Sequence, residues 1–312
     1  MSIKRFISNQ SRNIHHSRNA QTQNKQDISV NSKIPSEGKQ NRYHLYMSYA
    51  CPFAHRAMLV RSLKGLDKVI SASALWVDNE SRYIFSGNPD EGSIDPYNKK
   101  KTLMDVYKMN KFKSKATVPA LFDINSNRII NNKSAEIMRM FNSSFNEFAE
   151  YPNHDFYPCN LRKTIDSTSE WIHRDINKGV YSVGAAIRQI IYDKQVGKVF
   201  EALDKAEEIL SKQRYMCGDI LTEADLKLFP SLIRFDSIYY TLFYCNKKML
   251  REYEHLSGYM REIYQIPGVE STVSTEHIKA IYMKYRKDNN PRRIIPIGPT
   301  VDLHSPHGRD HI

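Results

Sequence analysis

Apolar and polar positions follow two different periods in the first half of the chain. Several short apolar runs have the length of strands, whereas apolar residues between residues 52 and 64 recur with helical spacing. Gly65 stands where glycine commonly ends a helix, and the stretch 78–101 is polar and loop-like. The predicted elements are, in order, a strand at 44–48, a helix at 52–64, a strand at 69–75, hairpin strands at 118–122 and 128–130, and a helix at 134–141.

Beyond about residue 160 the strand pattern disappears, and long amphipathic helices take its place. Thr222 and Asp225 have the spacing of a helix N-terminal capping box, and Pro267 with Gly268 separates the last helices. The predicted helices cover 161–178, 185–213, 222–244 and 251–266. We therefore expect four regions: a basic leader at 1–38, an α/β domain at 39–145, an all-α domain at 160–288, and an extended, proline-containing tail at 289–312 laid across the core.

Length and composition favour a globular protein of two domains. The chain has 312 residues, of which 40% are hydrophobic and 11% aromatic, which is enough for two cores. No run approaches the roughly 18 consecutive apolar residues of a membrane span. The four cysteines lack the spacing of metal ligands or of a disulfide framework; they are Cys51, Cys159, Cys217 and Cys245. We therefore expect no membrane span, no metal and a reducing compartment.

The positive charge is concentrated at the N-terminus. The formal net charge is +12, from 46 basic and 34 acidic residues. Residues 1–26 hold five basic residues and no acidic one, so the rest of the chain carries about +7 in interspersed charges, typical of a solvated surface. Nucleic-acid binding is therefore not expected. The leader is similar to a mitochondrial transit peptide; the alternative is a disordered tail on a cytoplasmic protein.

Cys51 is the strongest candidate for a reactive side chain. It follows the first predicted strand and directly precedes Pro52, at the first turn of a predicted helix. Unpaired backbone N–H groups and the positive end of the helix dipole favour a thiolate there, so we expect a lowered thiol pKa and a nucleophile. Ala54 stands where a dithiol oxidoreductase has its second cysteine, so an external thiol must resolve a disulfide at Cys51. The other three cysteines are interpreted as packing residues.

The order of elements and a long series of motifs resemble one family. A nucleophile after the first strand of a β-α-β unit, then a hairpin and a helix, and then a helical domain, is the arrangement of glutathione transferases. The motifs are Arg42-Tyr-His-Leu-Tyr46, Ala50-Cys-Pro-Phe-Ala-His-Arg56, Leu63-Lys-Gly65, Thr117-Val-Pro-Ala-Leu121, Gly179-Val-Tyr181, Gln213-Arg-Tyr215, Gly218-Asp219, Leu221-Thr-Glu-Ala-Asp225, Ile233-Arg-Phe-Asp236 and Pro306-His-Gly308. Over residues 40–310 the chain resembles the Xi class, the glutathionyl-hydroquinone reductases, which are related to fungal Omega-like glutathione transferases. The resemblance implies a thioredoxin-like domain followed by a helical transferase domain, in a homodimer.

The resemblance also implies a glutathione site around Cys51, which matches the residue that forms a mixed disulfide with glutathione in that family. The implied binding residues are Tyr83, Lys115, Val118, Pro119, Lys133 and Ser134. Val118 precedes a cis Pro119 and pairs its backbone with the cysteinyl part of glutathione, while Ser134 binds the γ-glutamyl carboxylate at a helix N-terminus. Tyr83 takes the place of an aromatic residue, usually Trp, and Lys115 that of an arginine.

Lys133 departs from the family pattern. Relatives usually have Glu at this position, where it holds the ammonium group of glutathione. A cation at this position weakens glutathione binding unless another acid, such as Glu136, reaches the ligand.

Three tyrosines of the helical half are candidates for the hydroquinone site. Tyr181 and Tyr282 match family residues that act in catalysis and substrate binding, because a phenol can hydrogen-bond the substrate oxygens and pass protons. Tyr285 stands nearby and is a further candidate for substrate binding. His55 and Arg56, although next to the nucleophile, are interpreted as structural.

Together these residues predict a glutathione-dependent thiol transferase that reduces glutathionyl-hydroquinones, with glutathione as a substrate and glutathione conjugates as small-molecule partners. Two alternatives stay open. An Omega-like thioltransferase or dehydroascorbate reductase would use the same cysteine without the tyrosines. A non-enzymatic binding module would keep the fold alone.

Overall fold

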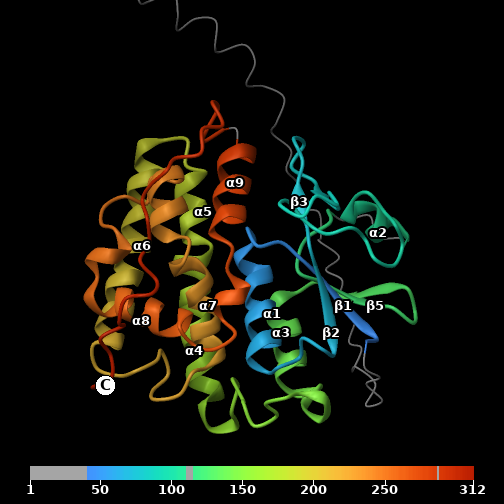
Figure 1. Ribbon diagram of the computed structural model, residues 1–312. Helices are drawn as coiled ribbons and strands as arrows, with labels where there is room; N and C mark the ends of the chain where they lie inside the picture. Colours follow the sequence, from blue (N-terminus) through green and yellow to red (C-terminus); the bar gives the residue numbers. More distant parts are fainter. Residues whose placement is uncertain (1–40, 110–114, 287) are drawn as a thin grey trace, which may run out of the picture.

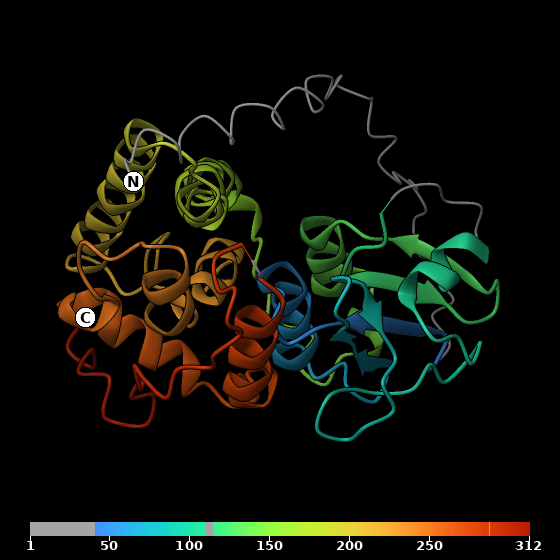
Figure 2. The same ribbon diagram turned by 90° about the horizontal axis from the view of Figure 1, so that it is seen from above.

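The computed structural model describes residues 41–109, 115–286 and 288–312, and the predicted basic leader lies outside them. Figure 1 and Figure 2 show a part that contains the sheet beside a larger part made of helices. All strands of the described residues precede position 132, and helices dominate after it. This arrangement confirms the predicted fold class, an α/β domain followed by an all-α domain.

The main sheet of the first domain is mixed. Its strand order is β2-β1-β5-β6, with β1 parallel to β2 and antiparallel to β5, and β5 antiparallel to β6. The strands are β1 (Tyr43–Met47), β2 (Ile70–Ala74), β5 (Ala120–Asp123) and β6 (Arg128–Asn131). Each lies within one or two residues of its predicted position, and the order is that of the expected thioredoxin-like domain.

Strand β1 is buried on both faces of the sheet, which explains its continuous apolar and aromatic character. Helices α1 (Pro52–Leu63) and α3 (Ser134–Ser143) lie on the face turned toward the helical domain (Figure 1). On the other face the loop after β4 covers Tyr46, whose hydroxyl group donates a hydrogen bond to the buried Asp95 carboxylate at 2.9 Å.

The stretch predicted as a loop at 78–101 is partly ordered. Strands β3 (Trp76–Val77) and β4 (Tyr83–Ile84) form an antiparallel hairpin at its start, and α2 (Leu103–Met109) follows its end. Strands of two residues are too short to show a hydrophobic period, so the sequence pattern missed them. The tip of this hairpin forms one rim of the cavity described below.

The second domain consists of helices in the residues that the structure describes. They are α4 (Arg162–Trp171), η4 (Ile172–Asn177), α5 (Gly179–Gly184), α6 (Gln189–Leu210), α7 (Glu223–Leu232), η5 (Phe235–Tyr240), α8 (Glu254–Tyr264) and α9 (Thr275–Tyr285), with 3₁₀ turns η2 (Asn146–Phe148), η3 (Cys159–Leu161), η6 (Leu250–Glu252) and η7 (Glu270–Thr272). None of the described helices is both long and apolar enough to cross a membrane.

Two of the predicted helices break into an α-helix followed by a π-helical turn. The predicted helix 161–178 becomes α4 and η4, and the predicted helix 222–244 becomes α7 and η5. In η5 the Tyr239 N–H group donates to the Arg234 carbonyl, five residues earlier, at 3.2 Å. Hydrophobic periodicity does not separate such turns from an α-helix, yet they often occur at functional sites.

Helix α1 lies between the two domains and packs against α3 on one side and α7 on the other (Figure 1). Nearly all of its side chains are therefore buried. His55 hydrogen-bonds the Thr272 hydroxyl at 2.8 Å, and Arg56 donates to the Asn177 side chain, which confirms the interpretation of both as structural residues. Gly65 ends the helix with a φ of +64°, as predicted.

The C-terminal tail runs back over the helical domain without regular secondary structure (Figure 1). The Gln265 side chain donates hydrogen bonds to the carbonyl groups of Leu303 and Ser305, at 2.9 and 2.8 Å. Arg309, near the end of the chain, is buried and pairs with Glu262 at 3.1 Å. These contacts attach the tail to α8.

Candidate active site

Cys51 is the N-cap residue of α1. The chain leaves β1 and reaches Cys51 in an extended conformation, with φ −82° and ψ 114°, and Pro52 occupies the first helical position. No acidic residue lies in the first turn, so the N–H groups of Phe53 and Ala54 face the sulfur unopposed. The half-buried thiol donates a hydrogen bond to the Val118 carbonyl, 3.5 Å away.

The pKa of the Cys51 thiol is raised in this structure, which corrects the expectation of a lowered value. Burial is the largest cause and outweighs three effects that lower the pKa, namely the N–H groups at the helix terminus and the charges of Arg234 and Arg56. The helix terminus therefore lowers the pKa of Cys51, but by less than the loss of hydration on burial raises it. The sulfur is a thiol at neutral pH, in agreement with the hydrogen bond that it donates.

A cavity of about 730 Å³ opens over Cys51 between the two domains. The first domain lines it with residues 50–53, the hairpin tip 79–81, Tyr83 and residues 115–118, and the second domain lines it with Tyr181 and residues between 281 and 289. The candidate nucleophile thus lies at a domain junction, where small-molecule sites are common.

The helical wall of the cavity carries the predicted pair Tyr181 and Tyr282. Their hydroxyl groups hydrogen-bond each other, and both rings contact Tyr239 and Phe243. Burial raises the pKa of both phenols above the usual value of 10.0. Each is therefore a neutral hydrogen-bond donor at physiological pH. The structure brings both predicted tyrosines and the cysteine to one cavity.

Three of the predicted glutathione-binding residues line the same cavity: Tyr83, Lys115 and Val118. The peptide bond between Val118 and Pro119 is cis, as predicted. Burial and the neighbouring Cys51 raise the pKa of Tyr83 well above 10.0, so this phenol is also neutral. These residues share the first-domain wall with the nucleophile.

Lys133 and Ser134 lie beyond the lining of this cavity, at the N-terminus of α3. The neighbouring Asn132 connects them to the cavity wall, because its side chain donates a hydrogen bond to the Thr117 hydroxyl at 3.3 Å. The structure therefore places these two predicted residues outside the lining around Cys51, next to a side chain that is bonded to that lining.

The charge of Lys133 is paired within its own helical turn. Its ammonium group lies 3.2 Å from a carboxylate oxygen of Glu136, and Glu136 also accepts a hydrogen bond from the Asn131 side chain at 2.9 Å. A carboxylate is thus present near this helix terminus, one turn beyond the position where the resemblance implies it, and a cation is bound to it.

Tyr285, the third predicted tyrosine, lines the cavity, but its hydroxyl group is bonded to the other domain. It accepts a hydrogen bond from the Trp76 indole N–H group at 3.1 Å. This bond joins the β3–β4 hairpin to α9 across the cavity rim, so Tyr285 presents its ring rather than its hydroxyl group to a ligand.

Two further side chains, one behind the helical wall and one on it, were missed by the sequence analysis. Tyr239 in η5 is fully buried, and its hydroxyl group makes no hydrogen bond of good geometry among the described residues. Arg286 lines the cavity just beyond α9, with its guanidinium carbon 5.7 Å from the centre of the Tyr181 ring. Neither carries a sequence signal, since Tyr239 lies in apolar sequence and Arg286 resembles a solvated charge.

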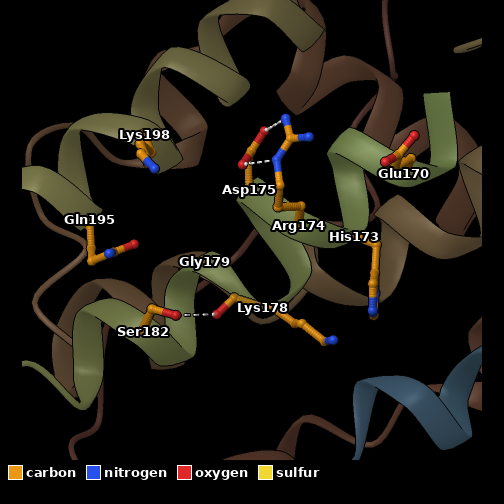
Figure 3. A pocket seen from close by; sticks show the side chains of 9 residues that line it. All are labelled: Glu170, His173, Arg174, Asp175, Lys178, Gly179, Ser182, Gln195 and Lys198. Carbon is orange, nitrogen blue, oxygen red and sulfur yellow. Dashed lines mark hydrogen bonds and ion pairs between the residues drawn. The ribbon is translucent and has the colours of Figure 1, made fainter. Parts of the chain in front are cut away.

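A second hollow, of about 400 Å³, lies between η4, α5 and α6 (Figure 3). Its Arg174 and Asp175 form a bidentate ion pair, with N–O distances of 2.8 and 2.6 Å. His173 points from this hollow toward α1 (Figure 3), where its ring contacts Phe53, and burial lowers its pKa to about 4. No cysteine lines this hollow, so the candidate nucleophile belongs to the first cavity alone.

The remaining cysteines divide into two kinds. Cys217 and Cys245 are buried, as packing residues should be, whereas Cys159 in η3 is exposed and corrects the packing interpretation. Among the described residues, no group of three or more His, Cys, Asp or Glu side chains is placed to hold a metal ion.

Comparison with protein families gives two matches. The family model for the glutathione S-transferase N-terminal domain matches residues 50–144, and that for the glutathione S-transferase C-terminal domain matches residues 189–262. A glutathionyl-hydroquinone reductase of Escherichia coli is 42% identical over 275 residues, 87% of this chain and 84% of that protein. A glutathione S-transferase omega-like protein of Schizosaccharomyces pombe is 38% identical over 275 residues, 85% of this chain and 88% of that protein.

Two solved structures have the same fold over most of their length. The glutathione-bound structure of a glutathione transferase homologue from Escherichia coli has a TM-score of 0.85 and 41% identity, covering 88% of this chain and 90% of that one. A Xi-class glutathione transferase from Natrialba magadii has a TM-score of 0.86 and 40% identity, covering 88% of this chain and 85% of that one.

Proposed function

The chain belongs to the glutathione transferase family and to its Xi class, and we propose that it is a glutathione-dependent enzyme that reduces glutathionyl-hydroquinones. One observation carries the proposal: a single cavity joins Cys51 at a helix N-terminus to the hydrogen-bonded pair Tyr181 and Tyr282. The cysteine suits sulfur chemistry, and the phenols suit an aromatic substrate that carries oxygens.

Cys51 is the nucleophile of the proposed reaction. After losing its proton, its sulfur attacks the glutathionyl sulfur of the substrate, and an S–S bond forms between Cys51 and glutathione. The bond between the glutathionyl sulfur and the ring carbon breaks, its electron pair stays on the ring carbon, and this carbon takes up one proton to give the released hydroquinone. The ring is thereby reduced, and the two sulfurs are oxidised to a disulfide.

A second glutathione completes the cycle. Its thiolate attacks the mixed disulfide, releases oxidised glutathione and returns Cys51 to the thiolate. An external thiol is required because Ala54, three residues after Cys51, offers no sulfur.

The tyrosine pair handles the protons of the quinol. Both phenols are neutral because burial raises their pKa, so each can donate to a hydroquinone oxygen or supply the proton that the ring carbon takes up. The hydrogen bond between the two hydroxyl groups lets one phenol pass a proton to the other.

The raised pKa of Cys51 is compatible with this chemistry. A thiolate formed from a less acidic thiol is the stronger nucleophile, so a small ionised fraction still reacts. The Val118 carbonyl, which now accepts the thiol hydrogen bond, is also the group that would accept a backbone N–H of glutathione. A ligand whose N–H group bonds to this carbonyl replaces the thiol hydrogen bond, and the protonated form of Cys51 is then less favoured.

The alternatives are less well supported. An Omega-like thioltransferase needs Cys51 but gives no role to the buried phenol pair on the opposite wall. A non-enzymatic binding module gives no role to the cysteine at the helix N-terminus or to the phenol pair in the same cavity.

Mass spectrometry after incubation with glutathionyl-menadiol, a glutathionyl-hydroquinone, tests the proposal. We expect a glutathione adduct on the peptide that contains Cys51 and the release of one menadiol for each adduct formed. An adduct without menadiol would indicate simple disulfide exchange. If a folded sample gives neither product, the enzymatic function is ruled out.

A homodimer is part of the proposal, because the family arrangement implies it. Light scattering coupled to size-exclusion chromatography should give twice the 36.4 kDa mass of the chain. A mass of one chain at micromolar concentration would exclude a stable dimer.

Mitochondrial location is also part of the proposal. It is supported by the basic composition of residues 1–26, which contain no acidic residue. A fluorescent fusion of the full chain should co-localise with a mitochondrial marker, and the same fusion without residues 1–38 should not. Equal distributions of the two would favour a cytoplasmic protein.

A further inference from the structure

Arg234, between α7 and η5, is a buried cation without a counter-ion in the described part of the chain. None of its surface is exposed (0%). It donates hydrogen bonds to the carbonyl groups of Tyr49 at 2.6 Å, Ala50 at 3.2 Å and Pro230 at 2.6 Å, and to Nδ1 of His55 at 3.2 Å. All four acceptors are neutral, because the pKa of His55 is lowered well below 6.5 by burial and by Arg234 itself.

Arg309 in the same domain shows the usual arrangement. It is 2% exposed and also donates to backbone carbonyl groups, but its Nε lies 3.1 Å from the Glu262 carboxylate. A guanidinium group remains charged when buried, and the charge is costly unless an anion accompanies it. The missing anion at Arg234 therefore points to a negative charge that forms nearby during function.

The hydrogen bonds of Arg234 are directed at the turn that precedes the nucleophile. Tyr49 and Ala50, whose carbonyl groups it binds, are the two residues before Cys51. A second buried arginine, Arg56, lies on α1 and donates to the neutral side chain of Asn177. Among the described residues, these two arginines are close to Cys51 and neither forms an ion pair with a carboxylate.

We propose that Arg234 is a positioning residue for Cys51: it fixes the turn before the nucleophile and supplies the positive charge that balances the Cys51 thiolate. The inference rests on the proposed function, in which that thiolate is the reactive species. The missing counter-ion of Arg234 is then the nucleophile itself, which is an anion only while it reacts.

The electrostatics around Cys51 agree with this role. The charged or titratable groups that interact with Cys51 are Arg56 on α1, Tyr83 on β4, Tyr181 on α5, Arg234 and Tyr282 on α9. The three phenols are neutral, so the two arginines are the charges, and both lower the pKa of Cys51 against the effect of burial.

The test separates the charge of Arg234 from its shape. Arg234→Gln keeps hydrogen-bond donors and loses the charge, whereas Arg234→Lys keeps the charge and loses the planar fork. The rate of alkylation of Cys51 by iodoacetamide, followed on its own peptide by mass spectrometry across pH 7 to 11, reports the thiolate without any hydroquinone. This readout distinguishes failure of the inference from failure of the proposed function.

We expect the Arg234→Gln variant to react about tenfold more slowly at pH 8, because its titration midpoint moves up by about one pH unit. The Arg234→Lys variant should remain within about threefold of the wild type. Arg309→Gln, a matched change at a buried arginine away from the cavity, should leave the Cys51 midpoint unchanged even where it lowers thermal stability.

Two results would overturn the inference. One is a folded Arg234→Gln variant with an unchanged midpoint, and the other is an Arg234→Lys variant as slow as Arg234→Gln. If neither variant folds, the wild type decides the question by NMR with labelled arginine. The Nε resonance of Arg234 should then shift with the midpoint of Cys51 ionisation while that of Arg309 does not, and an Arg234 resonance that is constant across the Cys51 titration also overturns the inference.

Discussion

The two walls of the cavity offer a ligand different kinds of chemistry. The first-domain wall works through the backbone: the Cys51 sulfur faces N–H groups at the start of α1 and donates to the Val118 carbonyl. The helical wall works through side chains, with Tyr181 and Tyr282 bonded to each other above a buried aromatic cluster. The first wall holds the sulfur that any disulfide exchange needs, whereas the second holds the phenols that only a quinol substrate needs.

This difference makes the walls separable by experiment. A change on the first-domain wall should lower every reaction of the enzyme, because all of them pass through the same sulfur. A change on the helical wall should lower quinol turnover and leave glutathione-dependent disulfide exchange in place. The measurements below compare the two activities on the same samples.

Removing the nucleophile should have the largest effect. In Cys51→Ser both quinol reduction and disulfide exchange should fall at least about a thousandfold, because a serine hydroxyl group is a poor nucleophile without a general base. Steady-state turnover of glutathionyl-menadiol and of a mixed glutathione disulfide measures the two reactions. The same substitution at the exposed Cys159 is the control, and retention of either activity by Cys51→Ser would break the assignment of both reactions to one sulfur.

Removing one phenol should separate the two activities. Tyr181→Phe should lower quinol turnover by about a hundredfold, since proton transfer by a positioned side chain is lost, while disulfide exchange stays within about threefold. Tyr192→Phe is a matched control, because its hydroxyl group donates to the Tyr244 carbonyl at 2.8 Å outside the cavity. Equal loss of both activities in Tyr181→Phe would mean that the helical wall also supports the sulfur chemistry.

The two walls also differ in how far the sequence predicted them. Cys51 at a helix start and the strands around it were predicted within one or two residues, because strand period, proline and helix-start signals are local, whereas the cis bond before Pro119 was implied by the family resemblance. The side chains that surround Tyr181 and Tyr282 were not predicted from the sequence. Arg234 directly precedes a π-helical turn and Tyr239 lies within it, and hydrophobic spacing does not reveal such a turn. Both residues reach the site through contacts between segments distant in sequence.

The electrostatic prediction for Cys51 failed for a related reason. The helix terminus is a local feature and was identified correctly, but burial depends on both domains closing over the sulfur. Local sequence describes the effect that lowers the pKa, while the larger effect that raises it arises from tertiary structure.

The pH dependence of Cys51 reactivity follows from this balance. Because the thiol pKa is raised above its usual value, the thiolate fraction should increase about tenfold per pH unit between pH 7 and pH 8 in the protein without substrate. Alkylation by iodoacetamide, resolved by peptide, measures this slope, with the exposed Cys159 as an internal reference for the reagent. A rate for Cys51 that is constant over this range would place its pKa below neutrality and restore the sequence expectation.

The smallest expected effect concerns the N-terminus of α3, beyond the first-domain wall. Lys133→Glu removes the cation that is paired with Glu136 and puts a carboxylate at the position where the family resemblance implies one. Glutathione should then bind about two- to fivefold more tightly, the range of a partly exposed ion pair, with a lower KM for glutathione and an unchanged kcat. Lys163→Glu, the same charge reversal at an exposed position of α4, controls for the net charge.

The companion variant Glu136→Gln tests the same site from the other side. It leaves Lys133 without its partner, so a cation then faces the ammonium group of glutathione and the KM should rise. If Lys133→Glu and Glu136→Gln both leave the KM for glutathione unchanged, the N-terminus of α3 does not hold the γ-glutamyl group. Glutathione recognition would then lie wholly within the lining of the cavity, at Tyr83, Lys115 and Val118.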